Sequence, residues 1–177
     1  MSNSIKPQQL IADVIQILQA ARQKAYAVVN TEMVKAYWLM GKRIVEEEQH
    51  GEQKAIYGEA ILKTLSVALT SELGKGFSYA NLRNFRQFYL TYPNPEICYT
   101  LCSKLTWSHN RLIMRVENPE ARNYYLRECA EQNWSVRVLE RNITTFYYQR
   151  LLSSNVKQIE IKDNQLEKKA TINDFIK

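Results

Sequence analysis

The chain has 177 residues, 45% of them hydrophobic and 11% aromatic, which is enough to build a sizeable core. Five glycines and four prolines argue against a turn-rich β protein, and no apolar run of about 18 residues is present to cross a membrane. The net charge of +6 favours a polyanionic partner, and three cysteines without disulfide or metal spacing suit a reducing, cytoplasmic setting.

The N-terminus lacks the continuous apolar segment of a signal peptide. Instead, a first predicted helix begins at Pro7, a favoured first helical residue, and its apolar pattern runs to about Glu48. Asn30–Thr31 either breaks this helix or is a polar spot within it. An unbroken helix would be about 60 Å long, which exceeds one small core. We therefore expect a helical hairpin here, or a partner chain that covers part of the apolar stripe.

Residues 57–92 predict a helix, a glycine-bracketed turn and a second helix. Gly74 and Gly76 stop the first helix, because glycine takes the left-handed C-cap conformation at little cost. Ser78 is a good N-cap for the second helix, which has two arginines and no acid as far as Leu90. A helix–turn–helix with a basic second helix resembles a DNA-reading unit. The alternative is that an all-α domain simply turns a corner here.

The second helix of this pair has an apolar side centred near Phe85 and a polar side opposite it. Arginine, asparagine and glutamine are the side chains suited to phosphates and base edges. The nucleic-acid-binding residues predicted from this turn and helix are Lys75, Tyr79, Arg83, Asn84, Arg86 and Gln87.

Prolines after Tyr92 end that helix, and residues 96–105 connect it to a helix for which Ser108 is a plausible N-cap. Another helix begins at Pro119, and Ser135 caps a last long helix with Phe146 in its buried stripe. These three helices with two tight junctions are a second candidate for helix–turn–helix packing. The predicted nucleic-acid contacts in this part are Lys104, His109, Arg111, Arg115, Arg137 and Arg141.

The positive charge is unevenly distributed along the chain. Residues 1–73 carry eight basic and eight acidic side chains, so the whole excess lies in residues 74–177. Between residues 75 and 115 there are six basic side chains, and Glu96 is the only acidic one. A basic block on a folded segment is the footprint of a polyanion partner, and a solvated face without a ligand is the alternative.

Catalytic motifs are absent, and the isolated His109 suits a structural or phosphate-contacting role. Cys98, Cys102 and His109 do not have the spacing of a zinc site. Glu160 and Lys162 match the E-x-K half of a PD-(D/E)-x-K nuclease core. That chemistry needs a further acidic ligand on a neighbouring strand, and none precedes at suitable spacing. We therefore read both residues as solvated linker charges and expect no catalysis and no cofactor in this chain.

Three strings are specific enough to indicate a family: L-T-W-S-H at 105–109, N-P-E-A-R at 118–122 and N-W-S-V-R-x-L-E-R at 133–141. With them, residues 10–155 resemble the N-terminal domain of the YhcG family, bacterial proteins long catalogued as a domain of unknown function. In that family the helical domain precedes a PD-(D/E)-x-K nuclease-like domain. The resemblance implies a module that binds or positions nucleic acid for an attached nuclease, which would supply the metal ligands.

Together these observations predict an all-α fold, a bundle of about six helices with helix–turn–helix-like units over residues 1–154. Residues 155–177 are expected to be a polar linker or tail toward a missing nuclease domain, so that the chain is a fragment. The predicted function is a non-catalytic DNA-binding or targeting module, and a protein interaction or dimerisation module is the alternative. DNA is the expected partner, together with a homodimer through the N-terminal helices. Neither a membrane nor a small-molecule substrate is expected, and Mg²⁺ is expected only for the missing domain.

Overall fold

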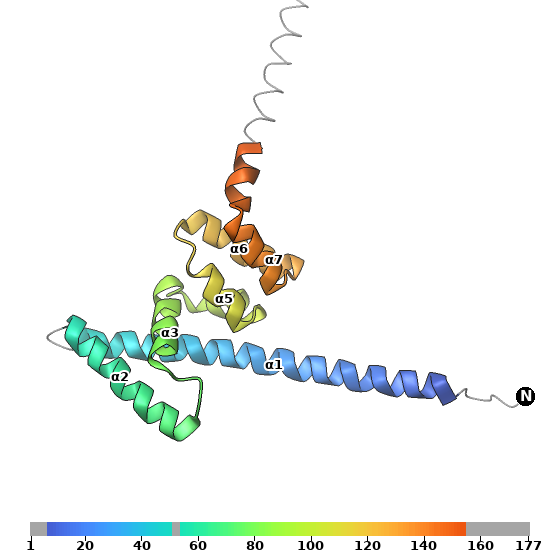
Figure 1. Ribbon diagram of the computed structural model, residues 1–177, viewed down its shortest axis with the longest axis horizontal. Coiled ribbons are helices and arrows are strands. Elements are labelled where there is room, and N and C mark those ends of the chain that lie inside the picture. The colour runs from blue at the N-terminus through green and yellow to red at the C-terminus, as the bar shows by residue number, and fades with distance from the viewer. Residues whose placement is uncertain (1–6, 51–53, 155–177) are drawn as a thin grey trace, which may run out of the picture. The chain divides into compact units, whose positions relative to one another are not determined.

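The computed structural model describes residues 7–50 and 54–154 (Figure 1). Every regular element in these ranges is helical, which confirms the all-α class. The linker predicted at 155–177 lies outside the described residues. The elements are α1 (Pro7–His50), α2 (Lys54–Leu73), α3 (Tyr79–Thr91), α4 (Pro95–Thr100), the 3₁₀ helix η1 (Cys102–Lys104), α5 (Trp107–Ile113), α6 (Pro119–Gln132) and α7 (Val136–Thr144).

The chain divides into two compact units, and the boundary in the sequence lies between Met114 and Arg115. The first contains α1 to α5, and the second contains α6, α7 and a further helical stretch at 147–154. None of the described helices is both long enough and apolar enough to cross a membrane.

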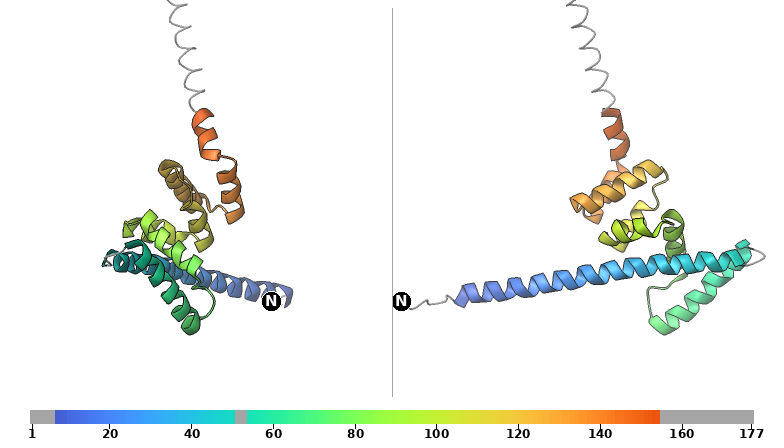
Figure 2. Two further views of the ribbon diagram at one scale, coloured as in Figure 1. Left: turned by 60° about the vertical axis from the view of Figure 1, so that its left-hand side comes forward. Right: turned by 180° about the vertical axis from the view of Figure 1, so that it is seen from behind.

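Helix α1 is continuous through Asn30 and Thr31, so of the two alternatives these residues are a polar spot within one long helix. Asn30 Nδ2 donates to the Leu105 carbonyl at 3.0 Å, and Thr31 Oγ1 donates to the Ser103 carbonyl at 3.1 Å. These polar side chains bind a different segment rather than competing for the backbone of their own helix. The packed part of α1 begins just after them at Val34, and the half of α1 before them extends beyond α2 to α5 (Figure 2).

The core of the first unit forms where α3 crosses α1. Phe85 of α3 stacks on Tyr37 of α1 with ring centroids 4.4 Å apart, and Trp107 of α5 packs on both rings. The helices can approach this closely because Gly41 of α1 has no side chain: a Cβ there would lie 2.0 Å from the carbonyl oxygen of Phe85. A glycine in the middle of a helix costs about 1 kcal/mol in helix propensity, and the crossing is what offsets it.

The α2–α3 corner follows the predicted turn chemistry. Gly74 and Gly76 have φ angles of +81° and +140°, which glycine adopts without steric cost. Ser78 is the N-cap of α3, and its hydroxyl oxygen accepts a hydrogen bond from the Asn81 amide at 3.4 Å. The predicted cap of α5 was wrong by two residues. Thr106 caps that helix, because its side-chain oxygen faces the free amide of His109.

The last predicted helix is also wrong, because it is interrupted at Phe146, which has a φ of +52° and is 65% exposed rather than buried. The side chain of Tyr125 on α6 bridges the interruption. Its hydroxyl donates to the Asn142 carbonyl at 3.1 Å and accepts from the Tyr148 amide at 3.2 Å. Two backbone groups released by the break are thus satisfied inside the protein.

The first prediction concerns the helix crossing. Gly41→Ala should destabilise the protein by about 2 kcal/mol or more, because the added methyl group meets backbone that cannot move aside. Chemical denaturation monitored by circular dichroism measures the loss. Gly58→Ala is the comparison, since the methyl group added there would meet a side chain, the Glu48 carboxylate at 2.8 Å, rather than backbone. Its loss should be smaller, because Glu48 can shift at the cost of part of its pairing with Arg86. Equal losses in the two variants would contradict the importance of the close approach.

Candidate nucleic-acid interface

Helix α3 has the two-sided character that its sequence predicted. Leu82, Phe85 and Phe88 are buried in the first unit. Arg83 and Gln87, one turn apart, are exposed on the other side. A further candidate, Lys75, is exposed in the turn before the helix, whereas Asn84 is half-buried. The exposed candidates here are therefore Lys75, Arg83 and Gln87, of which Gln87 already donates to the Thr91 hydroxyl at 3.2 Å.

Two other candidates on α3 have structural partners instead. Tyr79 packs against the cluster around Phe85. The Arg86 Nε donates to both carboxylate oxygens of Glu48 on α1, at 2.9 and 2.7 Å. The Glu48 side chain is only 11% exposed, so the ion pair is partly shielded from water and binds α3 to α1. The charge of Arg86 is therefore balanced within the unit, which the sequence could not show for residues 38 positions apart.

The candidates around α5 are also unequal. Lys104 on η1 is exposed, and Arg111 is half-buried. His109 is 8% exposed, and its Nδ1 lies 2.7 Å from the Thr106 hydroxyl in the cap of α5. We predicted either a structural or a phosphate-contacting role for His109, and this placement favours the structural one. Its neighbour Asn110 is fully buried and donates to the Cys102 carbonyl at 3.0 Å, a structural contact that the sequence did not indicate.

In the second unit, a short turn joins α6 to α7. The turn is only residues 133–135, with Asn133 in the left-handed conformation at φ 52° and Ser135 as the N-cap of α7. Leu139 is buried, whereas Arg137 and Arg141 are exposed one turn apart. The turn length agrees with that of DNA-binding helix–turn–helix motifs, which place the second helix in the major groove.

The predicted residues thus fall into separate groups on the two units. Lys75, Arg83 and Gln87 belong to the α3 face of the first unit, and Lys104 is exposed on η1. Arg137 and Arg141 belong to the α7 face of the second unit, which also has Arg115 exposed at its start. The α7 group follows the shorter of the two turns, residues 133–135, whereas residues 74–78 precede α3.

Metal or redox chemistry finds little support in the part of the chain that the structure describes. Residues 7–50 and 54–154 contain no group of three histidine, cysteine, aspartate or glutamate side chains that could hold a metal ion. Burial raises the pKa of the Cys98 and Cys129 thiols to about 12, and it raises the pKa of Cys102 further. A recess of about 390 Å³ between α1 and α2 is lined mainly by apolar side chains such as Ile44, Ile61 and Leu65.

These features define a class: an all-α module with exposed arginines on the helices that follow its short turns. The family model described as "DUF1016 N-terminal domain" matches residues 13–150, and the chain belongs to this family. It is 33% identical over 186 residues to a protein of Escherichia coli (strain K12) named "Putative nuclease YhcG", and the match covers 89% of this chain and 50% of that relative. The chain therefore spans about half the length of the relative, and the predicted family resemblance is confirmed. No solved structure matches the chain.

The Arg86–Glu48 pair yields a second prediction. Arg86→Met should destabilise the first unit by about 1–2 kcal/mol, because it leaves a nearly buried carboxylate without its partner. Arg43→Met is the matched control, since Arg43 pairs with Glu47 at 2.6 Å but with both side chains more exposed, at 67% and 38%. It should cost less than about 0.5 kcal/mol. Denaturation midpoints compare the variants, and a similar loss in both would show that shielding does not matter.

The raised thiol pKa values yield a third prediction. Only the thiolate attacks alkylating reagents, so the native protein should react with iodoacetamide at pH 8 far more slowly than the unfolded protein. Raising the pH to 9 should leave most of this protection in place, because the pKa of these thiols is about 12. Mass spectrometry counts the modified cysteines with time. Rapid alkylation of the native protein would mean that the thiols open to solvent.

Proposed function

We propose that this chain is the DNA-targeting module of a nuclease-like protein and that it is non-catalytic by itself. The observation that carries this proposal is the α6–α7 helix–turn–helix, whose second helix exposes Arg137 and Arg141. Arg137 is the second residue of α7, and the N-terminal residues of a recognition helix are those that contact base edges. Arg141, one turn further on, is suited to a phosphate.

The α3 face of the first unit supports the same role. Lys75 in the turn and Arg83 on the helix offer two further positive charges, and Gln87 offers an amide suited to adenine. Arg86 contributes to the position of α3 rather than to the ligand, because Glu48 balances its charge. We assign Lys104 and Arg115 to peripheral phosphate contacts.

The comparison with the Escherichia coli relative supports an attached nuclease, since that protein is named as one and this chain matches half of it. We propose that the nuclease chemistry belongs to the other half. The described residues here lack a cluster of metal-binding side chains, and nuclease chemistry of this kind uses carboxylates to hold Mg²⁺. An incubation of the chain with supercoiled plasmid and Mg²⁺ should therefore produce no nicking.

The fourth prediction tests DNA binding directly. The purified chain should bind duplex DNA at about 50 mM salt, and its affinity should fall steeply with salt, because each neutralised phosphate contributes about −0.9 to the slope of log K against log[salt]. Fluorescence anisotropy with a labelled duplex measures both quantities. No binding to duplex or single-stranded DNA at low salt would contradict the proposal.

Paired charge reversals then locate the surface. Arg137→Glu with Arg141→Glu should weaken binding by at least tenfold and reduce the salt slope by about two. Arg127→Glu with Arg150→Glu is the matched control in the same unit, since both arginines are exposed but neither is on α7. Lys75→Glu with Arg83→Glu tests α3 in the same way. If only the α3 pair matters, the α7 helix is not the reading helix.

A further inference from the structure

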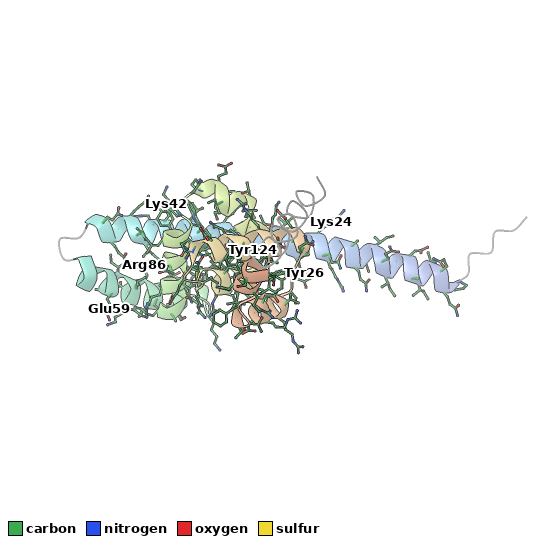
Figure 3. The ribbon with its side chains drawn as sticks, turned by 90° about the horizontal axis from the view of Figure 1, so that it is seen from above. Lys24, Tyr26, Lys42, Glu59, Arg86 and Tyr124 are labelled. Carbon is green, nitrogen blue, oxygen red and sulfur yellow. The ribbon has the colours of Figure 1, made fainter. Side chains whose placement is uncertain are left out.

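An apolar stripe runs along the N-terminal half of α1. Its large side chains are each between 46% and 67% exposed, which is unusual for so many aliphatic residues in succession. Figures 1 and 2 show that α2 to α5 of the same unit lie beside the other half of the helix, and Figure 3 shows the side chains of the stripe region around Lys24 and Tyr26. The stripe contains Leu10, Ile11, Val14, Ile15, Ile17, Leu18, Val28 and Val29.

The stripe is not a continuation of the core surface of α1. At about 100° per residue, Leu18 in the middle of the stripe and Trp38 in the core lie about 160° apart around the helix. Leu18 and the core residue Val34, which is 1% exposed, also lie about 160° apart around the helix. The helix therefore presents one apolar face to its own unit and the opposite one, further toward the N-terminus, to another partner.

We propose that this partner is a second copy of the chain, paired through the N-terminal half of α1 as an antiparallel two-helix coil. The centre of the stripe has the spacing that helix pairing requires, with steps of three and four residues that repeat over three heptads. The seam residues are Ile11, Val14, Leu18, Ala21, Ala25 and Val28.

The sizes of the seam residues favour the antiparallel direction. With a two-fold axis between residues 19 and 20, Leu18 meets Ala21 and Val14 meets Ala25, so each such layer combines a large and a small side chain. Ile11 meets Val28 at both ends. A parallel pair would stack leucine on leucine and alanine on alanine, and the separation set by the large layers would leave voids at the small ones. Antiparallel pairing keeps one separation along the whole seam.

Charge and position agree with this arrangement. Residues 7–29 carry only three charged side chains, so two copies would not repel each other strongly. Asp13 is turned away from the seam and accepts a hydrogen bond from Gln9 at 2.9 Å, so no acid is forced into the interface. The overlap pairs Pro7 with Glu32 and so stops just before Val34, where α1 enters its own core.

The size of the seam sets how tightly the two copies are expected to bind. A helix about 11 Å across and about 28 Å long offers roughly 500 Å² on one half of its surface. Two copies would bury roughly 1,000 Å², the lower limit of specific protein interfaces. We therefore expect a dimer that dissociates on dilution into the micromolar range. This inference is independent of DNA binding.

Sedimentation velocity on the full chain between about 1 and 100 μM tests the dimer. The wild-type protein should shift from monomer to dimer over this range, whereas Leu18→Glu should remain monomeric with unchanged helix content. Val67→Glu is the control, since Val67 is an apolar residue of α2 that is 74% exposed and lies outside the stripe. It should dimerise like the wild type. A wild-type monomer at every concentration, or a dimer unaffected by Leu18→Glu, would overturn the proposal.

Variants with one added cysteine test whether the two helices pair in the antiparallel direction. Leu18→Cys and Ala21→Cys should form a mixed disulfide faster when the two variants are combined than either variant does alone, because these positions meet across the axis. The native thiols are buried and should not contribute. Faster cross-linking within each single variant would show parallel pairing and overturn the register.

Discussion

The crossing of α1 and α3 at Gly41 is the contact on which the first unit depends. It allows the backbones of two helices to come into contact, and it brings the Phe85 ring against the rings of Tyr37 and Trp107. Once α3 is seated there, its opposite side faces solvent, and Arg83 and Gln87 are presented together. The α3 face, which supports our proposal for DNA, thus follows from an interaction that involves none of its exposed residues. Arg86 and Glu48 then fix the rotation of α3 about its own axis.

Local features of the sequence predicted the fold well. The apolar period predicted helices, and the turn at Gly74 and Gly76 and the serine caps at Ser78 and Ser135 were found where glycine and serine chemistry places them. The cap of α5 was misplaced because Ser108 ranks above Thr106 as an N-cap on propensity alone. The structure shows instead that the Thr106 side chain accepts from the His109 amide.

Long-range contacts were beyond the reach of the same reasoning. The helical wheel placed Arg86 near the edge of the polar side, but nothing local indicates that Glu48 pairs with it. Asn30 and Thr31 left both a helix break and a polar spot open, because the carbonyls that they bind are more than 70 positions away. The candidate site was therefore predictable as a set of basic side chains on helical faces. Which of them remain free for a ligand depends on tertiary packing.

The hydroxyl of Tyr125 holds the interruption between α7 and the helical residues 147–154. In an uninterrupted helix the amide of Tyr148 would bond four residues back along its own backbone, and the axis would continue straight. Here that amide donates a hydrogen bond to the Tyr125 hydroxyl of α6, and this hydroxyl donates a hydrogen bond to the Asn142 carbonyl. A side chain from another helix has taken the place of one backbone bond. The break before residues 147–154 is thus supported by one oxygen atom that phenylalanine at position 125 would lack, together with the ring contacts of Tyr147 with Tyr124 and Trp134.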